Sequence, residues 1–197
     1  MSERKKESRE KWLEEGYRQF ALYGPDQLSI NSISKAIESS RASFYHFFGD
    51  IDIFIDKLLA IHWKASDEFN ALGKQQCKAL FPDLYELLVQ YPIPLQFSLQ
   101  LFHHRHYPRF NYIYIKTYEV SAHAFALKLF ADHLDLDADD KAVYNLWYTL
   151  GEAWYSRLDP NDLSVETLQH HSKEIIKSVS KFLSSELYAT LQSSPLV

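Results

Sequence analysis

SINSISKAIESSRASFYHFF, residues 29–48, predicts two short helices joined by a tight polar turn. Ser29 is a suitable N-cap, because its hydroxyl can accept a hydrogen bond from an amide of the first helical turn. Ile30, Ile33 and Ile37 then repeat at helical spacing, which gives the first helix one apolar face. This arrangement is typical of a helix-turn-helix, so the segment indicates double-stranded DNA as a partner.

The second helix divides its side chains between packing and exposure. Phe44, Phe47 and Phe48 supply packing, while small or hydrogen-bonding residues lie between them, as a recognition helix requires. We expect the phosphate contacts to come mainly from Ser29, Lys35, Arg41 and Tyr45. We expect the residues nearer the base edges to be Ser40, Ala42, Ser43 and His46.

The flanking sequence completes a three-helix unit. An apolar stripe runs through residues 11–23, and Gly24 and Pro25 stop that helix. After Gly49, a long amphipathic helix over residues 52–70 should connect this unit to the rest of the chain. We therefore predict an all-α protein with an N-terminal helix-turn-helix domain, residues 1–49, and a C-terminal helical ligand-binding and dimerisation domain, residues 50–197.

Charge is distributed unevenly along the chain. Residues 1–48 hold eight Lys or Arg against seven Asp or Glu, whereas residues 49–197 hold thirteen against nineteen. Only the N-terminal part is suited to neutralising phosphates, and then weakly. Most of its positive charge lies in a predicted arm, whose residues are Arg4, Lys5, Lys6, Arg9 and Lys11. These side chains either reach phosphates or are solvated charges on a fraying terminus.

The motifs of residues 9–60 resemble those of the TetR family of transcriptional regulators. The matching positions are Phe20, Gly24, Ser29, residues 33–36 (ISKA) and residues 40–48 (SRASFYHFF). Two positions depart from the family pattern. Glu38-Ser39 stands where the family usually has Gly-Val, and Gly49-Asp50 where it has a Ser-Lys pair. The first departure could strain the turn, and the second removes a phosphate contact.

The resemblance implies a homodimeric, all-helical repressor that binds a palindromic operator. It also implies that the C-terminal domain binds a small-molecule effector that changes the spacing of the two recognition helices. This would be a cytoplasmic protein that is not an enzyme and needs no cofactor. The lone Cys77 and the absence of an 18-residue apolar run agree with a reducing compartment and no membrane partner.

An aromatic-rich segment, residues 109–134, carries more apolar side chains than one buried stripe requires. Its tyrosine hydroxyls predict a mostly apolar effector pocket with a few polar points. The candidate ligand-binding residues are Phe102, His103, Tyr112, Tyr114, Tyr118 and Trp147. Alternatively, these tyrosines pack their rings in a core and send the hydroxyl to solvent.

A second functional class is a helical carrier or enzyme that uses the same pocket with His103 or His123. The sequence lacks a nucleophile-base pair and a Gly-rich phosphate loop, which disfavours it. The histidines in residues 103–106 do not have the spacing of a metal site, so we predict no metal.

The last two predicted helices, residues 138–157 and 164–191, should form a hairpin that dimerises as a four-helix bundle. Gly151 would allow close helix contact in that bundle. The predicted dimerisation residues are Tyr148, Tyr155, Ile175, Val179 and Phe182. The alternative is that these apolar faces fill an intramolecular core.

Overall fold

The computed structural model describes residues 3–183, without the side chains of Arg4, Phe182 and Leu183, and its architecture is all-α, as predicted. The N-terminal helices are α1 (Glu3–Tyr23), the 3-10 turn η1 (Pro25–Gln27), α2 (Ile30–Ala36) and α3 (Arg41–Phe48). The helices that follow are α4 (Ile51–Gln76), η2 (Leu80–Leu84), α5 (Tyr85–Gln90), α6 (Pro92–His103), α7 (Pro108–Ser121), η3 (Ala122–Ala126), α8 (Leu127–Leu134), α9 (Lys141–Tyr155) and α10 (Val165–Leu183).

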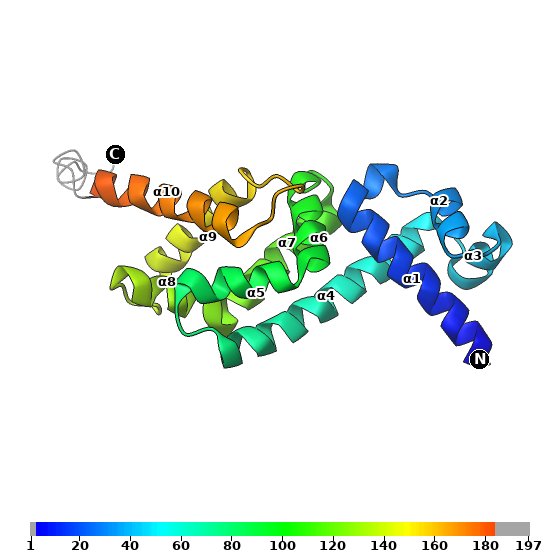
Figure 1. Cartoon of the computed structure of the whole chain (residues 1–197), viewed down its shortest axis with the longest axis horizontal. Helices are drawn as coiled ribbons and strands as arrows, with labels where there is room; N and C mark the ends of the chain where they lie inside the picture. Colours follow the sequence, from blue (N-terminus) through cyan, green and yellow to red (C-terminus); the bar gives the residue numbers. More distant parts are fainter. Residues whose placement is uncertain (1–2, 184–197) are drawn as a thin grey trace.

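The helices form an elongated molecule. Helices α2 and α3 lie at one end, and α8 and α10 lie at the opposite end (Figure 1). Helix α4 runs from the α2–α3 end along the body of the molecule, and it packs against α7 and η3. One continuous helix therefore belongs to both halves.

Side-chain caps fix the helix-turn-helix. The hydroxyls of Ser29 and Ser40 accept hydrogen bonds from the amides of Ser32 and Ser43, and Asp50 Oδ1 accepts one from the Ile53 amide at 2.8 Å. Each bond satisfies an amide that the helix itself leaves unpaired. The starts of α2, α3 and α4 thus follow from residues that are visible in the sequence.

The turn between α2 and α3 contains a residue in the left-handed region of the backbone. Glu38 has φ 51°, which is unfavourable for a side chain with a Cβ. The chain still closes the turn, since the Ser39 hydroxyl lies 2.8 Å from the Ser43 hydroxyl. Glu38 thus has the left-handed backbone on which the expectation of strain in this turn rests.

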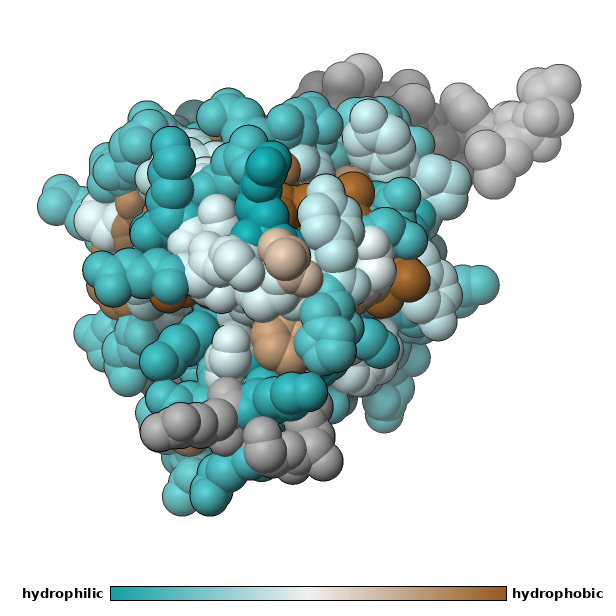
Figure 2. Space-filling view, turned by 90° about the vertical axis from the view of Figure 1, so that its right-hand side faces the viewer, coloured by the Kyte–Doolittle hydropathy of each residue, from teal (hydrophilic) through white to brown (hydrophobic). Residues whose placement is uncertain are grey.

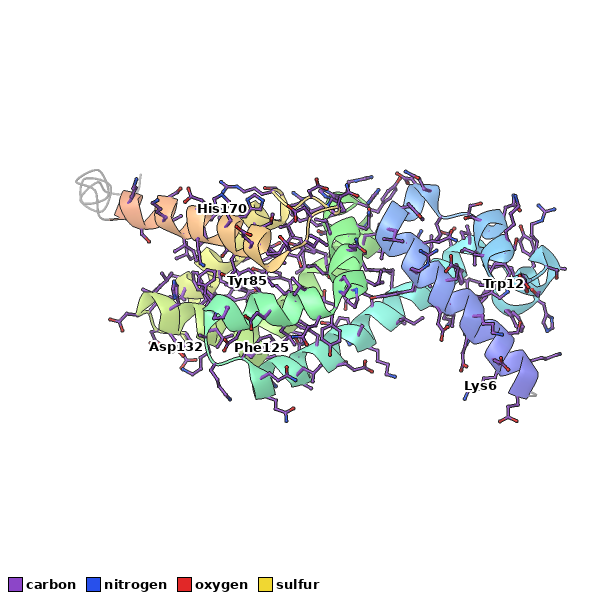
Figure 3. All side chains as sticks on the ribbon, viewed as in Figure 1. Lys6, Trp12, Tyr85, Phe125, Asp132 and His170 are labelled. Carbon is purple, nitrogen blue, oxygen red and sulfur yellow. The ribbon has the colours of Figure 1, made fainter. Side chains whose placement is uncertain are left out.

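Aromatic rings form the core of the N-terminal helices. Trp12 of α1 packs against Phe44 of α3 with ring centroids 5.2 Å apart, and Phe44 meets Phe54 of α4 at 5.1 Å. Figure 3 shows Trp12 on the side of α1 that faces this cluster. The same core continues into α6, because Phe20 stacks on Phe97 at 4.2 Å. We retain residue 49 as the proposed domain boundary, although packing crosses it.

The predicted basic arm is not an arm. Residues 4–11 form the first turns of α1, because salt bridges Lys6–Glu10 and Lys11–Glu7 link neighbouring turns of the helix. Arg9 lies over the ring of Phe48, 5.5 Å from its centroid. The charged side chains of this segment therefore lie on a helix, and Lys6 and Lys11 are exposed on it.

Two helix boundaries differ from the sequence-based prediction. Helix α4 extends to Gln76, beyond its predicted end at residue 70. The π-helical turn η3 lies inside the predicted helix over 109–134 and places Phe125 directly over Gly73 of α4. A side chain at position 73 would overlap that ring, so Gly73 allows α4 and η3 to approach.

Among residues 3–183, none of the helices has the length and apolar composition needed to cross a membrane.

Candidate functional site

A cavity of about 150 Å³ lies between α4, α5, α6, α7, η3, α9 and α10. The residues that line it include no Lys, Arg, Asp or Glu. Aromatic side chains make up much of the wall, and these are Phe69, Tyr85, Tyr91, Tyr114, Tyr118, Phe125, Phe130, Trp147, Trp154 and Tyr155. Figure 3 shows two of them, Tyr85 on α5 and Phe125 in η3, in the half of the molecule away from α2 and α3. A cavity of this size holds a molecule of about the size of benzene.

Contacts between α7 and α9 order one side of the wall. Tyr118 stacks on Trp147 with centroids 5.9 Å apart, and its hydroxyl donates a 3.0 Å hydrogen bond to the Trp147 carbonyl. Gly151 makes room for this, because a Cβ at that position would overlap the Tyr118 hydroxyl. The glycine that was expected to serve a dimer contact therefore admits a tyrosine of the same chain.

Four tyrosines of the wall, Tyr85, Tyr114, Tyr118 and Tyr155, remain neutral phenols. Burial raises the pKa of Tyr85 and of Tyr155 to about 12, and it also raises the pKa of Tyr114 and Tyr118. A neutral hydroxyl both donates and accepts a hydrogen bond. The wall therefore offers ring faces and hydroxyl groups, with no full charge.

His62 of α4 links the cavity to the N-terminal helices. Its Nδ1 lies 3.0 Å from the Tyr17 hydroxyl of α1, and its Nε2 lies 3.2 Å from the Ser98 hydroxyl of α6. The imidazole also stacks on Phe97 at 4.5 Å. Burial lowers the pKa of His62 to about 3, so the ring is neutral at ordinary pH. Both His62 and Ser98 line the cavity.

The structure brings together half of the predicted ligand-binding residues. Tyr114, Tyr118 and Trp147 line the cavity. Phe102 is buried beside it and stacks on Tyr155 at 5.4 Å without lining it. His103 is exposed at the end of α6, and Tyr112 is 60% exposed on the outer side of α7, so neither faces the cavity.

Sequence reasoning missed the polar pair His62 and Ser98 as cavity residues. Nothing in the local pattern separates His62 from other inward-facing positions of α4, because its partner Tyr17 is 45 residues away. The two histidines of the carrier or enzyme hypothesis lie elsewhere. His123 is exposed and stacks on Tyr144, and His103 is exposed as well.

The neighbouring histidines of residues 103–106 do not converge. His104 Nδ1 lies 2.9 Å from the Gln100 carbonyl, and its Nε2 lies 3.5 Å from Asp26 Oδ2. Within the part of the chain that the structure describes, no three His, Cys, Asp or Glu side chains are grouped so that they could hold a metal ion.

The predicted DNA-contacting side chains lie at the α2–α3 end of the molecule. Figure 2 views this end, whose surface is mostly hydrophilic, with only scattered hydrophobic residues. The exposed members of the set are Lys35, Ser40, Arg41, Ala42, Tyr45 and His46. Ser29 and Ser43 are half-buried, and the Ser43 hydroxyl already donates to the Ser40 carbonyl. These two serines shape the motif and present less surface than the others.

The predicted dimerisation residues separate into two groups. Tyr155 lines the cavity, and Ile175 also lines it and is only 5% exposed, so both face the interior of their own chain. Tyr148 and Val179 are half-buried and do not line the cavity. The side chain of Phe182, and residues 184–191 of the predicted last helix, lie outside the described part of the chain.

Comparisons with known proteins show the fold. No family model matches the chain, and no curated protein matches its sequence. A crystal structure of a proposed transcriptional regulator from Saccharomonospora viridis, in complex with choline, is similar with a TM-score of 0.63. The two chains are 18% identical, and the superposition covers 87% of this chain and 96% of that one. The likeness thus extends over both halves of the molecule.

Proposed function

We propose that this protein is a ligand-responsive, DNA-binding transcriptional regulator of the TetR type that acts as a repressor. The observation that carries the proposal is that α3 has one buried, apolar face and one exposed, polar face. Phe44 and Phe48 are buried in the core, while Arg41, Tyr45 and His46 project outward from the same helix. A rigidly anchored helix with exposed polar side chains at the end of a molecule can enter a major groove.

The electrostatics of this end favour a dimer. Residues 1–48 carry a small excess of positive charge, which yields little nonspecific affinity for phosphates. Two copies bound to the two halves of a palindrome would combine their contacts. We propose that this homodimer forms through α9 and α10, with Tyr148 and Val179 on the contact face.

The cavity is the proposed effector site. Its ring-lined wall, free of full charges, is suited to a small quaternary ammonium ion, which ring faces attract through their electron density. The Saccharomonospora viridis protein was crystallised with choline, an ion of this class. We therefore propose choline or a close relative as the effector, bound among Tyr85, Tyr118 and Trp154.

A chain of polar groups gives the effector a route to the DNA-binding end. Ser98 and Tyr155 both line the cavity, the Ser98 hydroxyl lies 3.2 Å from His62 Nε2, and His62 Nδ1 lies 3.0 Å from the Tyr17 hydroxyl of α1. Tyr17 also stacks on Phe97 at 4.5 Å, so α1 packs directly on α6. A ligand that favours one position of these residues changes the position of α1, which packs against α2 and α4.

Selection of bound fragments from a pool of random double-stranded DNA tests the proposal. A dimeric reader should enrich a palindromic site whose half-sites lie about one helical turn apart. If no sequence were enriched, the proposal that the protein is a DNA-binding regulator would be contradicted. Enrichment of a single, non-repeated half-site would remove the dimer.

The DNA interface can be checked with Arg41→Ala. We expect weaker binding to every sequence and a salt dependence reduced by about one counterion, because a phosphate contact is lost. Lys128→Ala on α8 removes a comparable positive charge at the other end of the molecule and should leave both quantities unchanged. An Arg41→Ala variant with the wild-type salt slope would contradict the assigned role.

A further inference from the structure

Two buried polar atoms in the cavity wall have no hydrogen-bond partner among the residues that the structure describes. They are the hydroxyl oxygen of Tyr114 on α7 and the indole Nε1 of Trp147 on α9. Tyr114 is only 2% exposed. Buried polar groups are nearly always paired, so two orphans in one cavity need an explanation.

These orphans differ from the others in the molecule. Trp12, Asn70 and Gln96 also hold unpaired buried atoms within the described part of the chain, but none of the three lines the cavity. Tyr114 and Trp147 both do. They flank the same ring, because Tyr118 lies 6.1 Å from Tyr114 and 5.9 Å from Trp147 between centroids. Both residues with unpaired groups therefore pack against Tyr118 in the cavity wall.

The chemistry of the pair identifies what it would bind. An indole N–H only donates a hydrogen bond, and a neutral phenol can donate one as well. Burial, followed by the neighbouring Tyr155, Tyr148 and Glu152, raises the pKa of Tyr114, which keeps its proton in place. Two donors on residues of one cavity wall are matched by a ligand atom that accepts hydrogen bonds, which is an oxygen.

The charge of that oxygen is constrained by its surroundings. No basic side chain lines the cavity. Arg105 lies outside, held by the Phe102 carbonyl and 4.0 Å above the Phe102 ring, and Glu152 opposes it from α9. A carboxylate placed here would lose its hydration without gaining a cationic partner, and this is costly. An uncharged hydroxyl, carbonyl or ether oxygen has no such cost.

We propose that Tyr114 Oη and Trp147 Nε1 form an oxygen subsite that binds the uncharged oxygen of the effector and selects against carboxylates. This subsite rests on the proposed function, because it assumes that the cavity binds a small quaternary ammonium ion. The subsite would bind the hydroxyl end of that ion. The rings hold the ammonium group, and the Tyr114–Trp147 pair holds a hydroxyl two carbons away. The ligand class is thus an amino alcohol cation rather than an amino acid betaine.

Three ligands with the same trimethylammonium group test the subsite by isothermal titration calorimetry on the full-length protein. Choline carries a hydroxyl, ethyltrimethylammonium replaces that hydroxyl with hydrogen, and glycine betaine replaces the alcohol carbon with a carboxylate. We expect choline to bind at least tenfold more tightly than either of the others, because it alone pairs both donors without burying an anion.

The Tyr114→Phe variant tests which residue is responsible. It removes one oxygen and keeps the ring, so the preference for choline over ethyltrimethylammonium should fall severalfold. Trp147→Phe should reduce the same ratio, and the ratio discounts any loss of ring contact that both ligands share. Tyr112→Phe, on the exposed side of the same helix, is the matched control and should keep the wild-type ratio.

Equal affinity of the wild-type protein for choline and ethyltrimethylammonium would overturn the oxygen subsite while the proposed cation-binding cavity stood. Betaine binding as tightly as choline would overturn the selection against carboxylates. If none of the three bound at millimolar concentration, the subsite and the proposed effector class would both be overturned, whereas the DNA selection would still report on the regulator itself.

Discussion

The molecule contains two aromatic clusters that differ in composition and in packing. In the N-terminal cluster, mainly phenylalanines pack against Trp12, and their rings meet one another directly across α1, α3 and α4. In the C-terminal cluster, tyrosines and tryptophans surround about 150 Å³ of space. A buried phenyl ring needs only van der Waals contacts, whereas a buried phenol or indole also has a polar atom that needs a hydrogen-bond partner. This difference fits our proposal that the N-terminal cluster stabilises the DNA-binding helices and that the C-terminal cluster binds the effector.

The largest expected effect tests the packing of the N-terminal cluster. Phe44→Ala removes a ring that is fully buried between Trp12 and Phe54, so the free energy of unfolding should fall by about 3–5 kcal/mol. Phe69→Ala, in the wall of the existing cavity, should cost less, because the surrounding residues already tolerate space. Urea denaturation measures the free energy of unfolding of both variants. Equal losses would contradict the claim that the two clusters are packed differently.

The next effect concerns His62, which joins the two clusters. The unfolded chain takes up a proton at this residue near its ordinary pKa of 6.5, whereas the folded protein does so only near the lowered pKa of about 3. As pH falls between these values, the unfolded state binds the extra proton and the folded state loses stability by about 1.4 kcal/mol per pH unit.

His62→Gln should remove this loss from the total pH dependence of the free energy of unfolding. Tyr17→Phe is the control, because it deletes a hydrogen bond to His62 and leaves the imidazole free to titrate. The measurement is thermal or urea unfolding between pH 7 and pH 4. Parallel curves for wild type and His62→Gln would show that His62 is not buried and neutral in the folded protein.

A smaller effect tests the shape of the cavity. Gly151→Ala places a methyl group where the Tyr118 hydroxyl lies, so this tyrosine must move and lose its bond to the Trp147 carbonyl. We expect a loss of about 1–3 kcal/mol in stability and weaker choline binding. Ala153→Gly, on the same helix, leaves Tyr118 undisturbed. If Gly151→Ala bound choline with unchanged affinity, Tyr118 would not be part of the choline site.

The smallest effect tests the strained turn in the reader. Glu38→Gly relieves the positive φ and should raise the free energy of unfolding by up to about 1 kcal/mol. Glu38→Ala removes the same charge and keeps the Cβ, so it should gain nothing. If the two variants were equally stable in urea denaturation, the backbone at position 38 would not be strained.

Local signals predicted the N-terminal half well. Ser29 and Ser40 cap their helices with their own side chains, and Glu38 adopts the backbone that its place in the turn requires. These interactions join residues a few positions apart, so a short stretch of sequence is enough to predict them. The predicted arm is instead the beginning of α1, which starts at Glu3 and carries the i, i+4 pairs Lys6–Glu10 and Lys11–Glu7.

The cavity was only partly predictable, because orientation around a helix depends on the neighbours it meets. Tyr112 and Tyr114 are two residues apart on α7, and one is exposed while the other is buried. Ile175 was assigned to a dimer face from its spacing, yet it lines the cavity of its own chain. His62 was not identified because its partners, Tyr17 and Ser98, come from distant helices.

The central claim is that occupation of the C-terminal cavity changes the action of the N-terminal reader. The most direct measurement is the affinity of the protein for its selected palindromic DNA, by fluorescence anisotropy at fixed salt, with and without saturating choline. We predict at least a tenfold weaker affinity with choline, which corresponds to about 1.4 kcal/mol of coupling between the sites. The same DNA affinity with calorimetrically bound choline would contradict the claim.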